Sequence, residues 1–169
     1  MHRLAIGLAL GGLAGLAALP QTAAAKPSVC VSSVIQQALV DAGKLTAEDI
    51  ANGQVVDLVR CGDVTGDGRA DALFTIASGG TAGDTRFGVL GGRAGGTPGA
   101  FVLYKHGYKV GIDRRTSRAF EVLQPHYGPN DPNCCPSSFR LRRYTWTGAS
   151  FKAGKVKKLK TAPRRFYRP

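Results

Sequence analysis

The period of the hydrophobic positions changes near residue 54. Between residues 31 and 43 the apolar side chains recur at the spacing of one helix face, and Gly43 supplies a stop signal. A second, shorter helix is expected to begin at Thr46, because Asp49 stands three residues later and can complete a capping box, and to end near Gly53. The apolar positions of the first helix are Val31, Val34, Ile35, Leu39 and Val40.

From residue 54 onward, short segments rich in β-branched and aromatic residues alternate with turn residues, which is typical of strands. The pair His106-Gly107 is expected to form a tight hairpin turn. Since no long helix separates consecutive strands, we expect an α+β fold, with the N-terminal helices packed on one face or edge of a predominantly antiparallel sheet of about six to eight strands. The expected strands are 54–62, 70–78, 86–92, 100–107, 108–113, 118–125, 139–146 and 151–156.

The first 25 residues have the pattern of a secretory signal peptide. A basic start at Arg3 precedes an apolar run over residues 4–19, and three alanines end the segment at Ala25, where cleavage is expected. The run is shorter than the ~20 apolar residues that span a bilayer. We therefore expect an exported protein with a single α+β domain over residues 26–150 and a basic C-terminal strand or tail over residues 151–169.

Four cysteines in an exported chain predict two disulfides that staple the domain. The cysteines are Cys30, Cys61, Cys134 and Cys135. Three pairings are possible, and a bond between the adjacent Cys134 and Cys135 would close a strained ring, so distant partners for each are favoured. The absence of a CxxC motif argues against a thiol-based function.

The stretch CGDVTGDGRAD, residues 61–71, places oxygen ligands at alternate positions around a glycine bend, as calcium loops do. The candidate ligands are Asp63, Thr65, Asp67 and Asp71, with the carbonyl oxygen of Arg69. An EF-hand is excluded, because its last ligand position is occupied by Phe74. The string resembles the D-x-x-x-D-G-x-x-D calcium loops of FG-GAP and VCBS repeats, but it occurs once, and a propeller needs several blades.

The same residues can also form a simple turn between two strands, with Asp63 and Asp71 accepting hydrogen bonds from turn amides. Against the simple turn stands the crowding of three carboxylates, which repel one another unless a cation lies between them. The calcium loop and the simple turn both stay open as interpretations. If the loop binds calcium, we expect a dissociation constant in the millimolar to submillimolar range.

A longer pattern extends over most of the chain: a cysteine before the first helix, a cysteine in an early strand, and NDPNCCPSSFRLRRYTW near the end. This pattern resembles exported actinomycete proteins related to the LppP/LprE lipoprotein family, whose biochemical function is unsettled. The resemblance implies that Cys30 and Cys61 pair with Cys134 and Cys135 in some order. It implies no enzyme activity, and the chain lacks the lipidated cysteine of that family.

Positive charge dominates the chain. Removal of residues 1–25 takes only Arg3 from the 23 basic residues, which leaves 22 against 11 acidic ones. The C-terminal basic residues are Lys152, Lys155, Lys157, Lys158, Lys160, Arg164, Arg165 and Arg168, with Arg140, Arg142 and Arg143 nearby. They form either a solvated tail or a surface that attracts a polyanion. Outside the cytoplasm the polyanion is expected to be an anionic lipid surface or wall polymer, whereas nucleic acid is disfavoured.

Residues that could support catalysis are few. His106 and His126 lack the spacing of a zinc site, and no G-x-S-x-G elbow is present. A polar cluster of His126 with Tyr127, Asp131 and Arg140 is conceivable. We therefore expect a secreted, non-enzymatic binding or structural protein of the cell envelope with a calcium loop. The alternatives are a small secreted enzyme and a protein inhibitor.

Overall fold

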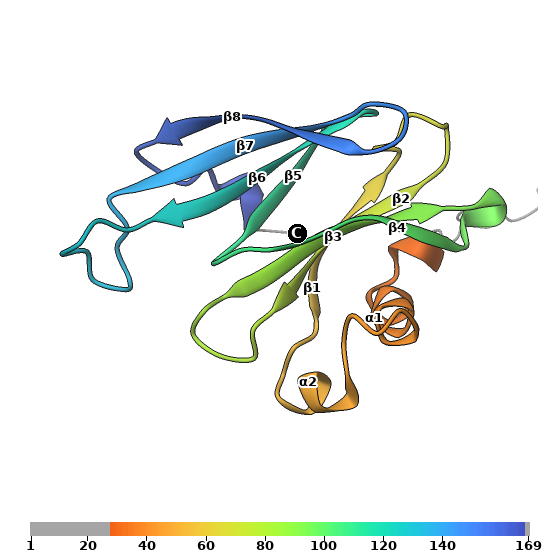
Figure 1. Ribbon diagram of the computed structural model, residues 1–169, viewed down its shortest axis with the longest axis horizontal. Helices are drawn as coiled ribbons and strands as arrows, with labels where there is room; N and C mark the ends of the chain where they lie inside the picture. The colour runs from red at the N-terminus through yellow and green to blue at the C-terminus, as the bar shows by residue number, and fades with distance from the viewer. Residues whose placement is uncertain (1–27, 168–169) are drawn as a thin grey trace, which may run out of the picture.

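The computed structural model describes residues 28–167 (Figure 1). The expected signal peptide and Arg168 lie outside the described residues. Within them, two helices and eight strands form three layers, with the helices on one side of the first sheet and the second sheet on its other side (Figure 1). This architecture confirms the expected α+β class and its antiparallel strands.

Both predicted helices are present. Helix α1 (Ser32–Asp41) buries Ile35 and Leu39, and the chain leaves it through Gly43 with φ of +62°, a conformation that favours glycine. Helix α2 (Ala47–Ala51) begins with a capping box, in which the amide of Asp49 donates to the Thr46 hydroxyl and the Asp49 carboxylate accepts from the Thr46 amide. A 3-10 turn, η1 (Ser28–Cys30), precedes α1.

The strands are divided between two four-stranded sheets in which every neighbouring pair is antiparallel. The first sheet is ordered β1-β2-β3-β4 and the second β5-β6-β7-β8, so consecutive strands are always neighbours. The first four strands are β1 (Val56–Gly62), β2 (Asp71–Ala77), β3 (Asp84–Gly92) and β4 (Pro98–His106). The others are β5 (Gly111–Thr116), β6 (Ala119–His126), β7 (Ser138–Trp146) and β8 (Phe151–Leu159).

The expected hairpin at His106-Gly107 is wrong. Strand β4 ends at His106, and the chain then crosses to the other sheet instead of turning back on β4. The crossing is held by two amides that donate to carbonyl groups of β3: Gly107 to that of Thr85 at 2.8 Å and Val110 to that of Asp84 at 2.9 Å. Residues 107–110 therefore connect the two sheets.

Two hydrophobic cores lie on opposite faces of the first sheet. Between the sheets, Leu73 and Phe87 pack against Phe120 and Tyr144 of the second sheet, with the Phe120 and Tyr144 rings stacked at 5.1 Å. On the other face, a second cluster joins the sheet to the helical layer. Its largest members are Ile35, Leu39, Leu45, Phe74, Ile76 and Leu90. Strand β2 contributes to both cores and is buried over six of its seven residues.

Two disulfides are formed, as expected, but the distant partners favoured for Cys134 and Cys135 are wrong, and so is the pairing implied by the family resemblance. Cys30 bonds Cys61, which ties η1 to the end of β1 with 5.5 Å between the Cα atoms. Cys134 bonds its neighbour Cys135 in the loop between β6 and β7. Cys30 lies beside β1 in the core under the helices, whereas the second pair is in an exposed loop, so no cross-pairing can form without large rearrangement.

The basic C-terminal segment is part of the sandwich as far as the structure describes it. Strand β8 pairs with β7 along its length, with Phe151 opposite Trp146 and Leu159 opposite Phe139. The chain then returns over the outer face of the second sheet, where the 3-10 turn η3 (Arg164–Phe166) buries Phe166 completely against β5. This anchor contacts the strand at Gly111, where a side chain would collide with Phe166.

One buried polar chain links three strands of the first sheet. The amide of Leu58 on β1 donates to the Thr75 hydroxyl on β2 at 3.1 Å, and that hydroxyl donates to the Asp84 carboxylate on β3. Burial is the main cause that raises the pKa of Asp84 to about 6, and the negative charge of Asp57 adds to it, although the Thr75 hydrogen bond acts in the opposite direction. Ionised Asp84 is therefore destabilising in the folded state.

An Asp84→Asn variant tests this conclusion. Because the folded-state pKa is raised, the folded protein holds more protons than the unfolded chain between about pH 4 and pH 6, and wild-type stability falls as the pH rises through that window. The amide retains an acceptor for Thr75. We expect the variant to equal the wild type below about pH 4 and to be more stable at neutral pH by roughly 1 to 2 kcal/mol after screening. Urea unfolding at a series of pH values measures the stability of the wild type and of the variant. A variant less stable than the wild type at neutral pH would contradict the conclusion that ionised Asp84 is destabilising.

Candidate functional site

The predicted calcium loop is a hairpin connection between β1 and β2, in which Gly62 pairs with Asp71. Asp71 is only 1 % exposed, and both of its carboxylate oxygens accept hydrogen bonds. One accepts from the amides of Val64 and Thr65 at 2.9 and 3.0 Å and from the Thr65 hydroxyl at 3.0 Å. The other accepts from the amide of Gly92 at 3.0 Å. Asp71 thus ties the loop to the far end of β3.

The other two aspartates of the loop face different amides. Asp63 accepts from the amides of Gly66 and Gly68, while Asp67 accepts from the amide of Arg69 at 2.9 Å and pairs with the guanidinium of that residue at 3.6 Å. These contacts are those of the turn interpretation. Within residues 28–167, no three acidic, histidine or cysteine side chains are grouped as a metal site. Calcium binding by this loop stays a prediction.

The contacts of Asp71 predict a large structural role. In an Asp71→Ala variant the buried amide of Val64 loses its acceptor together with three other donors, and we expect about 3 kcal/mol or more of lost stability by chemical denaturation. Asp63→Ala is the matched control, because its two donors lie at the partly exposed turn and can be satisfied by water; about 1 kcal/mol is expected there. Equal losses in the two variants would contradict the assigned role.

The calcium prediction has a separate test. Asp71 is already enclosed by hydrogen-bond donors of the protein, so a calcium ion would depend on the Asp67 carboxylate. To bind the ion, Asp67 would have to leave its ion pair with Arg69. We expect titration with calcium to give saturable heat at millimolar concentrations, and the Asp67→Ala variant to lose that heat. Absence of heat in the wild type, with no change in melting temperature between calcium and chelator, would leave the loop as a turn only.

The predicted polyanion-binding residues of the C-terminal segment do not share one surface. Strand pairing places Lys157 opposite Leu141 and Lys158 opposite Arg140, so these two adjacent lysines project from opposite faces of the second sheet. The remaining described members of the set are exposed along β8 and after it. They are Lys152, Lys155, Lys160, Arg164 and Arg165.

Arg165 is neutralised by acids of the outer face. It approaches Asp113 on β5 at 2.7 Å and Glu121 on β6 at 3.6 Å, and Arg115 pairs with the same two carboxylates at 3.5 Å. These acids lie about 50 residues before Arg165, so no local pattern around Arg165 predicts the pairing. The outer face of this sheet therefore carries compensated charge and packs against the C-terminal turn.

The opposite face of the same sheet carries uncompensated charge. We call Arg140, Arg142 and Lys158 the inner basic face: all three are exposed, and none forms an ion pair within the described residues. Arg140 lies directly opposite Lys158, and like charges in that register destabilise a sheet. The arginines border a hollow of about 130 Å³ with Gln124, Tyr144 and Val156.

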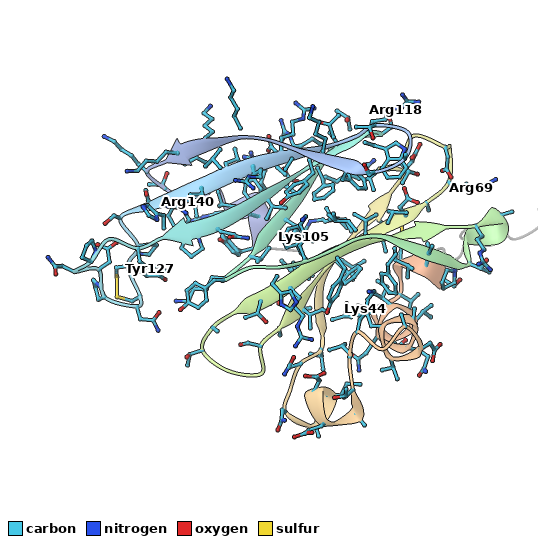
Figure 2. All side chains as sticks on the ribbon, in the orientation of Figure 1. Lys44, Arg69, Lys105, Arg118, Tyr127 and Arg140 are labelled. Carbon is cyan, nitrogen blue, oxygen red and sulfur yellow. A yellow bond between two sulfur atoms is a disulfide. The ribbon has the colours of Figure 1, made fainter. Side chains whose placement is uncertain are left out.

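The first sheet adds a further cation on the same side. Lys105 of β4 pairs in register with Phe87, whose ring belongs to the core between the sheets, so Lys105 projects from the inner face as well. It is exposed because the core ends before it. Figure 2 labels Lys105 on the first sheet and Arg140 on the second. Positive charge thus gathers where the inner faces extend beyond the packed core.

Edge protection explains only part of this charge. Strand β8 ends the second sheet, and lysines on an edge strand prevent pairing with other chains. Arg140 and Arg142 lie on β7, however, which is paired on both sides. Their charge gives no protection to an edge, so it calls for another explanation.

The polar cluster around His126 is not assembled as a catalytic relay. His126 contacts Arg140, with 3.5 Å between the ring Nε2 and the guanidinium. Asp131 instead closes its own loop, accepting from the amide of Gly128 at 2.7 Å and from the amide and hydroxyl of Ser137 at 2.6 Å. The hydrogen bond from the Ser137 hydroxyl is the main cause that lowers the pKa of Asp131. Asp131 is therefore a loop staple.

Comparison of the chain with models of known protein families, with characterised proteins and with solved structures finds no match. The resemblance to the LppP/LprE family stays a prediction that rests on the positions of the cysteines. Within the described part of the chain, no helix has the length and apolar character needed to cross a membrane.

Proposed function

We propose that the protein is an exported, non-enzymatic binding protein that associates with anionic polymers or head groups of the cell envelope through the inner basic face. The observation that carries this proposal is that Arg140 and Lys158 lie directly opposite each other in the sheet, with no acidic partner among the described residues. Arg142 lies on the same internal strand as Arg140. A bound row of phosphate or carboxylate groups would remove their repulsion.

Geometry favours an extended anionic partner. Arg140 and Arg142 are two residues apart on one strand, so their side chains project from the same face at about 7 Å spacing. Arginine can hold carboxylate or phosphate through two parallel hydrogen bonds. Lysines of β8 and Lys105 add a long-range field that attracts the partner without fixing its position.

Export is part of the proposal and rests on two features. Residues 1–25 have the composition of a signal peptide, and all four cysteines of the chain are at bonding distance in pairs. Disulfides persist in oxidising compartments and are rare in the cytoplasm. An envelope location would bring the basic face close to acidic polymers and lipids.

The experiment compares two triple variants that remove the same charge. In R140Q/R142Q/K158Q we expect affinity for inorganic polyphosphate, and for vesicles of phosphatidylglycerol and phosphatidylcholine, to fall roughly 100-fold at low salt, since each basic residue near an anionic surface contributes about 1 kcal/mol. Stability should be unchanged or higher because the repulsion between Arg140 and Lys158 is gone.

The control variant is R69Q/R93Q/R118Q, which alters three exposed arginines. Two of them, Arg69 and Arg118, lie at the end of the molecule away from Arg140 (Figure 2). We expect at most a few-fold loss of affinity here, through the weaker long-range field. Equal losses in both variants would show that net charge alone causes binding and would overturn the proposed face. Deletion of residues 152–169 is unsuitable, because it removes β8 and the buried Phe166.

A further inference from the structure

A second, separate cavity lies where β1 of the first sheet meets the start of β5. It has a volume of about 430 Å³, within the range of small-molecule pockets. Its walls come from both sheets, from the loop that holds the Cys134–Cys135 disulfide, and from the C-terminal segment. The lining includes Asp57, Asp84, Lys109, Tyr127, Phe139 and Tyr167.

Two carboxylates in this cavity have no positive partner. Asp57 and Asp84 lie on neighbouring sides of the cavity and interact with each other, and neither is within ion-pair distance of a basic side chain in the described residues. Asp84 is 8 % exposed; its carboxylate accepts a hydrogen bond from the Thr75 hydroxyl and interacts with Asp57 through charge and a side-chain hydrogen bond, and neither of these partners is a cation. Two carboxylates without a basic partner are unexpected in a chain with about twice as many basic as acidic residues.

The lysine that lines the cavity is committed elsewhere. Lys109 Nζ donates to the Tyr127 hydroxyl at 3.0 Å and to the Asn133 carbonyl at 2.7 Å. Its backbone has φ of +45°, the one left-handed residue other than glycine within residues 28–167, and such strain is held by surrounding contacts. Those contacts direct the ammonium group to the disulfide loop instead of the two acids.

The remaining walls are aromatic or apolar and are fixed in place. The Tyr127 hydroxyl donates to the Asn133 carbonyl at 2.9 Å, and the Tyr167 hydroxyl donates to the Lys109 carbonyl at 3.0 Å. Phe139, Leu58 and the prolines complete the apolar part. Lys109 Nζ already lies 5.5 Å from the centroid of the Tyr127 ring, so Phe139 and Tyr167 are the aromatic side chains left to contact a further cation beside the two carboxylates.

We propose that this cavity binds a small organic cation, an ammonium group carried on an apolar body, with the Asp57 and Asp84 carboxylates contacting the charge and the aromatic walls contacting the body. The argument rests on charge complementarity between two unpaired acids and the ligand. It is independent of the inner basic face, which lies on the other side of the second sheet and takes ligands of opposite charge.

The probe is phenethylammonium, with 2-phenylethanol as its neutral counterpart of similar size, titrated into the whole chain and followed by amide chemical shifts. We expect saturation by phenethylammonium with a dissociation constant on the order of a millimolar, shifts confined to residues that line the cavity, and binding of the alcohol at least about tenfold weaker.

Affinity should also depend on pH. The titratable groups that face Asp84 are Asp57, Lys109, Tyr127 and Tyr167. The hydrogen bond with Tyr127 raises the pKa of Lys109, and burial raises that of Tyr167 to about 12, so both keep their charge state below about pH 9. A cation binds the ionised form of Asp84, and we expect about tenfold tighter binding at about pH 8 than at about pH 5.

Asp84→Asn keeps the shape of the side chain and its acceptor for Thr75, and it is expected to lose about tenfold in affinity together with the pH dependence. Its folding is verified by its melting temperature. Asp41→Asn is the matched control: it removes an exposed carboxylate of α1 that accepts a hydrogen bond from Gln37, and its binding should equal that of the wild type. Equal binding of the alcohol, unchanged affinity in Asp84→Asn, or no saturable shifts in the cavity would overturn the proposal.

Discussion

Burial of β2 on both faces is the constraint on which the rest of the structure depends. Its even-numbered residues, Ala72, Phe74 and Ile76, pack under the helices, and Leu73 packs between the sheets. A strand in this position must be apolar on both sides, as DALFTIA is, apart from the hydrogen-bonded Asp71 and Thr75. Its one fully buried hydroxyl, on Thr75, is bonded to β1 and β3. Helices and second sheet are therefore positioned by the same seven residues.

Local features could be read from the sequence, because they depend on neighbouring residues. The capping box at Thr46 and the eight strands follow from side-chain chemistry within a few positions. The division into two sheets could not, since the turn chemistry at His106-Gly107 suits a hairpin and only packing decides that the chain crosses over. The cysteine pairing failed for the same reason: nearness in space between Cys30 and Cys61 is a property of the core.

The candidate sites show the same division. The composition of the C-terminal segment predicts its positive charge but not how that charge is distributed. The pleat of the sheet places Lys157 and Lys158 on opposite faces, and an acid distant in sequence pairs with Arg165. Asp57 and Asp84 belong to no sequence motif, because 26 residues lie between them and two successive hairpins, β1–β2 and β2–β3, bring them together. In both cases the charge that we propose to bind a ligand is recognised by the absence of an ion-pair partner within residues 28–167, and such partners depend on tertiary structure. Asp71 shows the opposite case. It belongs to a recognisable sequence motif, but hydrogen-bond donors of the protein itself already occupy both of its carboxylate oxygens.

The single crossing at residues 107–110 has a consequence for how the chain folds. Every strand pair joins neighbours in sequence, and each sheet is a continuous stretch of chain. Contacts are therefore local compared with those of a Greek-key sandwich, and low contact order favours rapid folding. Residues 28–106 contain the whole helical layer and every strand of the first sheet, so this part can form its strand pairs before the later hairpins dock. The domain is organised as two successive folding units that share one interface.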